Sequence, residues 1–77
     1  MELKQVLTDI ARAIVDTPDA VNVIENVDGD NVVLTLVVAE EDTGMVIGRH
    51  GKIAKAIRQV MKAAANTCGK HVTVEIK

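Results

Sequence analysis

The sequence predicts an α+β fold in which helices cover one face of a three-stranded mixed sheet. Two segments repeat apolar residues at helical spacing, two valine-rich segments flank an Asp-Gly pair, and the last residues alternate between apolar and polar. A chain of 77 residues has the length of one domain, which we expect to span residues 1–77. The predicted order of elements is α-β-β-α-α-β.

The first helix is predicted to begin near Leu3 and to end before Pro18. Its apolar residues recur at steps of three and four residues, and polar residues fall elsewhere on the helical wheel. Proline disfavours the helical conformation in the residue before it, here Thr17, and cannot donate a backbone hydrogen bond. The residues expected to face the core are Leu3, Val6, Leu7, Ile10 and Ile14.

The next two segments, residues 21–27 and 32–38, are predicted strands. Valine is frequent in both, and Asp28-Gly29 between them is a strong hairpin signal, so the strands are expected to pair antiparallel. The acidic run 40–42 is expected to end the second strand. One face of that strand is aliphatic, with Val32, Leu34, Leu36 and Val38.

Two helices and a strand complete the chain. Thr43 is expected to cap a short apolar helical segment over 44–47, and a long helix is predicted over 52–67, ended by Gly69. Residues 71–77 alternate as a last strand. Because two helices connect it to the second strand, we expect these two strands to be parallel. The open face of the sheet is a surface on which a second copy can dock.

The long helix carries an apolar stripe and a basic stripe. The apolar stripe is expected to pack in the core, except that Ile53 is expected to divide its surface between core, ligand groove and dimer contact. The basic stripe is either a solvated helix face or part of a binding surface. The apolar stripe comprises Ile53, Ala56, Ile57, Val60 and Ala64, and the basic stripe Lys52, Lys55, Arg58 and Lys62.

The composition excludes several classes of protein. Without Phe, Tyr or Trp, the chain cannot stack bases on aromatic rings as RNA-recognition motifs and oligonucleotide-binding folds do. One cysteine cannot form an internal disulfide, and the sequence has neither a signal peptide nor a long apolar run, so we expect a cytoplasmic protein. Cys68 is either a small buried apolar residue or a reactive thiol.

The charges are sorted along the chain. Residues 1–44 carry ten acidic residues against Lys4 and Arg12, a net −8, whereas residues 45–77 carry seven basic residues against Glu75, a net +6. This asymmetry fits an anion-binding face on an acidic body. The alternative is a charge-split surface that pairs internally or with a second copy.

The two halves meet at Gly48-Arg49-His50-Gly51, which joins an apolar turn to a helix that opens with basic residues. Glycines let the backbone approach a phosphate chain closely, and the amides at a helix start are unpaired donors. The segment does not match a nucleotide-binding P-loop, because Val46 and Ile53 stand where Gly and Ser or Thr are required. Neither His50 nor His71 lies in a full set of carboxylates, cysteines and histidines at ligand spacing, so we expect no metal, no cofactor and no catalytic role.

At these residues the sequence resembles the KH domain, whose hallmark is an apolar-apolar-G-x-x-G segment between two helices, here Val46-Ile47-Gly48-Arg49-His50-Gly51. The order α-β-β-α-α-β is similar to the bacterial, type II form. Residues 44–65 resemble the small stand-alone bacterial KH proteins of the KhpA type, and the resemblance extends over the whole chain. The sequence departs from the KH pattern at Ala54, where many KH domains have a large aliphatic residue.

The resemblance implies a non-enzymatic fold that clamps about four nucleotides of single-stranded RNA. It implies that the amides of Gly48 to Gly51 and the side chains of Arg49 and Lys52 face phosphates. The remaining implied site residues are Val46, Ile47 and Ile53 in the base groove, with His50 and Lys55 at its edge.

The resemblance also implies a homodimer, a heteromer with a larger KH-containing protein of the Jag type, and a role as an RNA chaperone or post-transcriptional regulator linked to cell elongation and division. The alternative is a protein-interaction module that dimerises and contacts RNA weakly or only through its partner. The acidic half of the chain keeps this alternative open.

Overall fold

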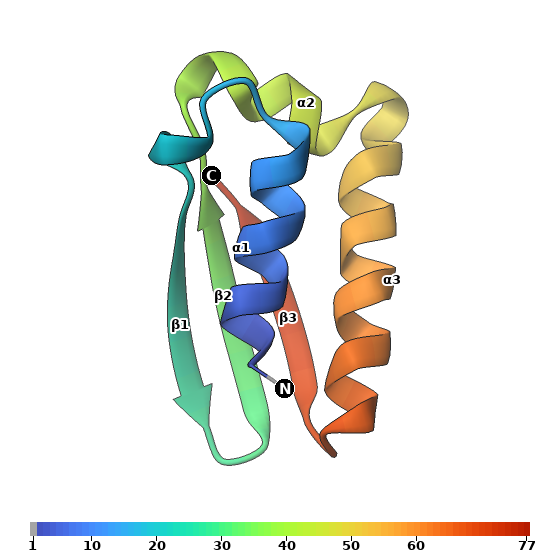
Figure 1. Cartoon of the computed structure of the whole chain (residues 1–77). Coiled ribbons are helices and arrows are strands. Elements are labelled where there is room, and N and C mark those ends of the chain that lie inside the picture. The colour runs from blue at the N-terminus through green and yellow to red at the C-terminus, as the bar shows by residue number, and fades with distance from the viewer. Residues whose placement is uncertain (1) are drawn as a thin grey trace.

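The computed structural model describes residues 2–77, and its elements follow the predicted order (Figure 1). Short 3₁₀ turns at Pro18–Ala20, Glu40–Asp42 and Arg49–Gly51 connect the longer elements. No helix within residues 2–77 has the length and apolar character needed to cross a membrane. The helices and strands are α1 (Leu3–Ile14), β1 (Asn22–Asp28), β2 (Asn31–Val37), α2 (Thr43–Ile47), α3 (Lys52–Thr67) and β3 (His71–Ile76).

The three strands form one mixed sheet in the order β1-β2-β3. β1 and β2 pair antiparallel around a tight turn in which Gly29 has a φ of 61°, a conformation that favours glycine. β2 and β3 pair parallel, with Val32 opposite Val72. The predicted hairpin and the predicted parallel pair are both confirmed.

The helices α1 and α3 lie side by side over one face of the sheet, and α2 crosses above them (Figure 1). Aliphatic residues from both helices and from all three strands meet between the two layers and form the core. The predicted aliphatic face of β2 is buried in this core. The core residues without exposed surface are Leu7, Ala11, Leu34, Leu36, Val46 and Met61.

The apolar stripe predicted for α3 is wrong by one position. Val60 is 50% exposed and Ala56 also lies at the surface, whereas Ile57 is buried and Ala64 partly buried, as predicted. Ile53 is 38% exposed, in line with the divided surface expected for it. The helix has more apolar positions than its core face needs, so periodicity alone could not select between two overlapping stripes. The stripe that enters the core is Ala54, Ile57, Met61 and Ala65.

Two boundaries also differ from the prediction. α1 ends at Ile14, because Val15 turns to an extended conformation and packs into the core. Thr43 is the first residue of α2 and does not cap it; Asp42 occupies the cap position. The Asp42 side chain is 1% exposed, and its Oδ2 accepts a hydrogen bond of 2.9 Å from the Thr17 N–H, which ties α2 to the connection after α1.

Candidate nucleic-acid interface

The loop between α2 and α3 is a turn built from left-handed residues. Gly48, His50 and Gly51 have φ angles of 75°, 58° and 73°. The Gly48 N–H donates to the Gly44 carbonyl at 2.9 Å, and the Gly51 N–H donates to the Gly48 carbonyl at 3.2 Å. Holding a non-glycine residue at positive φ costs free energy, and such residues are often found at functional sites. The conformation of His50 therefore makes this turn a candidate functional site.

Gly48 is required for a second reason, because Ile53 packs directly across it. A Cβ at position 48 would overlap the Ile53 side chain and would lie 3.0 Å from the Ile53 backbone nitrogen. A Cβ at Gly51 would meet nothing within 4 Å, so that glycine is required only by its φ. The first turn of α3 can therefore pack this closely against the loop only with a glycine at position 48.

Uncompensated positive charge surrounds the loop. Arg49, His50, Lys52 and Lys55 are all exposed, and no ion pair within residues 2–77 involves them. The first turn of α3 contains no acidic residue, although acidic side chains are the ones that stabilise a helix start. The positive end of the helix dipole at the start of α3 adds to the same field. This cluster of unpaired basic residues favours the binding of an anionic ligand, although it does not stabilise the start of α3.

The basic surface continues along α3 beyond the residues predicted for the site. The Arg58 Nε donates to the Val74 carbonyl of β3 at 3.2 Å, which holds this guanidinium beside the free edge of the sheet. Lys55, Arg58 and Lys62 lie on the same side of α3 by their spacing of three and four residues. Helical spacing from Lys55 could therefore have added Arg58 and Lys62 to the predicted site.

The aliphatic residues predicted for the groove separate into two groups. Ile47 and Ile53 are 39% and 38% exposed and lie on either side of the glycine turn. Val46 is fully buried in the core, so it supports the loop from behind and has no surface for a ligand. Ala54 is also buried, so its small size affects packing of the core and not the wall of a groove.

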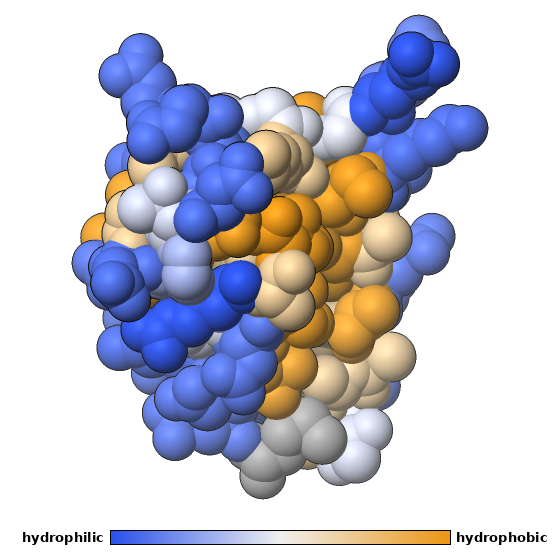
Figure 2. All heavy atoms as spheres, turned by 45° about the horizontal axis from the view of Figure 1, so that its top comes forward, coloured by the Kyte–Doolittle hydropathy of each residue, from blue (hydrophilic) through white to orange (hydrophobic). Residues whose placement is uncertain are grey.

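A second apolar area lies on the face formed by the two long helices (Figure 2). Val60 of α3 is half exposed, and Val6, Ile10 and Ile14 of α1 are only partly buried. Sequence periodicity assigned Val60 to the core and therefore missed this surface.

The order α-β-β-α-α-β, with a G-x-x-G turn between its last two helices, defines a KH domain of the type II form. The sequence model of one family, described as "KhpA/KhpB, KH domain", matches residues 4–76. The chain belongs to this non-enzymatic family.

Curated relatives match nearly the whole chain. The "RNA-binding protein KhpA" of Clostridium acetobutylicum is 53% identical over 74 residues, which cover 96% of this chain and 99% of that protein. The protein of the same name from Clostridium perfringens is 47% identical over the same shares of the two chains. The "RNA-binding protein KhpA" of Bacillus subtilis is 39% identical, and the match covers 96% of this chain and 91% of that protein.

Among solved structures, Era "in complex with MgGDPNP and nucleotides 1506-1542 of 16S ribosomal RNA" matches with a TM-score of 0.69. The match covers 96% of this chain and 28% of the Era chain, at 17% identity. At this identity the likeness supports the fold alone.

Proposed function

We propose that this chain is a cytoplasmic protein that works as a single KH domain and binds single-stranded RNA at the Gly48–Gly51 loop. The observation that carries the proposal is the left-handed glycine turn at the start of α3, surrounded by basic side chains that have no acidic partner in residues 2–77. The names of the KhpA relatives support RNA as the ligand.

Each part of the loop has a separate role in this proposal. The backbone amides of Arg49 and His50 and the side chains of Arg49 and Lys52 bind phosphates, because the amides of Gly48 and Gly51 already donate within the chain. Ile47 and Ile53 offer aliphatic surface to the bases. His50 and Lys55 border the groove, and Arg58 and Lys62 extend the positive surface along α3. About four nucleotides fill such a site.

The affinity for RNA should depend strongly on salt. If three or four phosphates are neutralised, the logarithm of the affinity should fall against the logarithm of the salt concentration with a slope of about −2 to −3, because each contact on a single strand contributes about −0.7. The measurement is a fluorescence anisotropy titration of a short single-stranded RNA at several salt concentrations. An affinity that does not change with salt would favour the protein-interaction alternative.

We also propose that the chain acts as a homodimer. The open face of the sheet, where a second copy was expected, mixes Ile24 and Val33 with polar residues such as Thr73 and Glu75. Apolar side chains also gather on the face formed by α1 and α3 (Figure 2). Val60 of α3 is 50% exposed. This face is the better candidate for the dimer contact.

Replacing Val60 by Asp should convert a dimer to a monomer, because a carboxylate in an apolar contact loses its hydration without gaining a partner. Sedimentation velocity at micromolar concentration measures the change. Gln59→Asp is the matched control, since it places the same charge on an exposed neighbouring position of α3 and should leave the dimer intact. A parent chain that is already monomeric, or a Val60→Asp variant that still dimerises, would exclude this face.

The membership in the KhpA/KhpB family supports a last part of the proposal. We propose that the dimer serves as an RNA chaperone or post-transcriptional regulator linked to cell elongation and division, and that it also associates with a larger KH-containing protein of the Jag type.

A further inference from the structure

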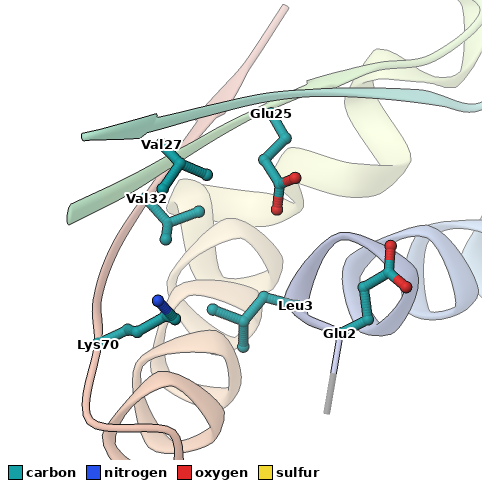
Figure 3. A pocket seen from close by; sticks show the side chains of 6 residues that line it. All are labelled: Glu2, Leu3, Glu25, Val27, Val32 and Lys70. Carbon is teal, nitrogen blue, oxygen red and sulfur yellow. The ribbon is translucent and has the colours of Figure 1, made fainter. Parts of the chain in front are cut away.

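A small hollow opens at the end of the molecule away from the glycine loop. It lies between the start of α1, the hairpin end of β1 and β2, and the turn from α3 into β3 (Figures 1 and 3). Its volume of about 140 Å³ suits one side chain or a group of benzene size. The residues that line it are Glu2, Leu3, Glu25, Val27, Val32 and Lys70.

The helices leave this end of the sheet partly uncovered. Val27 is paired with the buried Val32 and so belongs to the face that the helices cover, yet it is 57% exposed. α1 begins at Leu3, which packs beside Val32 in the floor of the hollow, and no helix within residues 2–77 continues over Val27. An apolar floor is therefore left open to solvent next to the last residues of β1.

β1, which borders the hollow, is an edge strand whose inward-facing charge is Glu25, the residue paired with the buried Leu34. Its seven residues, Asn22–Asp28, pair with β2 on one side, and no strand within residues 2–77 pairs on the other. It contains neither proline nor lysine, two residues that commonly block additional strands. The free edge therefore offers backbone donors and acceptors to an extended chain.

The charges of the hollow restrict what can bind there. Glu25 of β1 and Glu2, the residue before α1, lie at one side, whereas the Lys70 ammonium lies at the other (Figure 3). No ion pair within residues 2–77 joins these groups, so both carboxylates are available to a ligand. RNA phosphates would be repelled by them. A second copy added antiparallel about the middle of β1 would place Glu25 opposite Glu25, which is also repulsive.

We propose that the β1 edge and this hollow bind an extended, basic segment of a partner protein. The segment adds a strand to β1, so that its main chain provides hydrogen bonds along the edge. A Lys or Arg side chain on the helix-facing side of the added strand enters the hollow. Its methylene groups cover Leu3 and Val27, and its charged end reaches the carboxylates of Glu2 and Glu25.

A short peptide of alternating Val and Arg, blocked at both ends and labelled with a fluorophore, is the probe, and anisotropy reports its binding. Glu25→Lys should weaken binding about tenfold and Lys70→Glu should strengthen it about threefold, because each changes the charge in the hollow. Glu75→Lys is the matched control, since it makes the same charge change on β3, away from the hollow, and should leave the affinity unchanged. Thermal unfolding verifies that each variant is folded.

Two further measurements separate strand addition from general charge attraction and from RNA binding. A peptide with proline at alternate positions should lose most of its affinity, since proline cannot donate to the ladder. Glu25→Lys should leave the affinity for single-stranded RNA unchanged. Equal weakening by Glu25→Lys and Glu75→Lys, or equal binding of the proline peptide, would overturn the proposal without affecting the proposed RNA site.

Discussion

Replacing Arg49 and His50 together by Asp should abolish binding of single-stranded RNA while the chain keeps its thermal stability. Both side chains are exposed and make no hydrogen bond or ion pair within residues 2–77. Asp tolerates the left-handed conformation that position 50 requires, where φ is 58°. Two carboxylates beside a phosphate chain replace attraction by repulsion, and we expect an affinity at least about 100-fold lower.

The control for this variant places a similar charge change on α1. Lys4→Asp together with Gln5→Asp alters two exposed residues in the first turn of that helix. The second change replaces the exposed hydrogen bond from Gln5 to Asp9 by a like-charge pair, so a small loss of stability is expected in this control. Anisotropy titrations with a pyrimidine-rich and a purine-rich RNA, beside thermal unfolding by circular dichroism, compare the two variants. If the Arg49 and His50 variant melts like the parent and binds both RNAs equally well, the loop is not the RNA site.

Replacing Gly48 by Ala should be the most destabilising small change in the loop. The new Cβ would lie 2.9 Å from the Ile53 Cβ and 3.0 Å from the Ile53 backbone nitrogen, and a φ of 75° is unfavourable for alanine. Together, overpacking and the left-handed conformation should lower the free energy of unfolding by about 2–4 kcal/mol. In a chain of this size, that loss lowers Tm by roughly 10–25 °C. Thermal unfolding by circular dichroism measures the shift.

Two other glycines separate the causes of this effect. Gly51→Ala meets no atom within 4 Å but has a φ of 73°, so it should show only the conformational cost of about 1–2 kcal/mol. Gly44→Ala lies in α2 with ordinary φ and open space, and should stabilise the chain by about 0.4–1 kcal/mol. If the free energy of unfolding of Gly48→Ala is not lower than that of Gly51→Ala, the contact with Ile53 contributes little to the effect.

The features that the sequence predicted well are those with local physical causes. The turn at Asp28-Gly29 needs a left-handed glycine, and the helix over residues 52–67 has a strong apolar period, so both were predicted within about a residue. The exposure of Arg49 and His50 follows from their place between two glycines. These signals need no knowledge of the rest of the chain.

The features that the sequence did not predict depend on contacts between distant segments. The burial of Asp42 depends on the Thr17 N–H, 25 residues away in the chain. Val46 and Val60 are both apolar helical residues, and only the packing of α2 and α3 against the sheet decides that the first is buried and the second exposed. The hollow beside Val27 is lined by residues from distant parts of the chain, which no local pattern brings together.

The distance between the glycine loop and the hollow beside β1 also determines how the two proposed sites influence each other. The molecule is 34 Å long, whereas the Debye length at physiological ionic strength is about 8 Å. The carboxylates of Glu2 and Glu25 are therefore screened from an RNA bound at the opposite end, despite the net charge of −2. If both proposals hold, binding at one end should leave the affinity of the other unchanged, as an adaptor that holds an RNA and a basic protein segment at the same time would require.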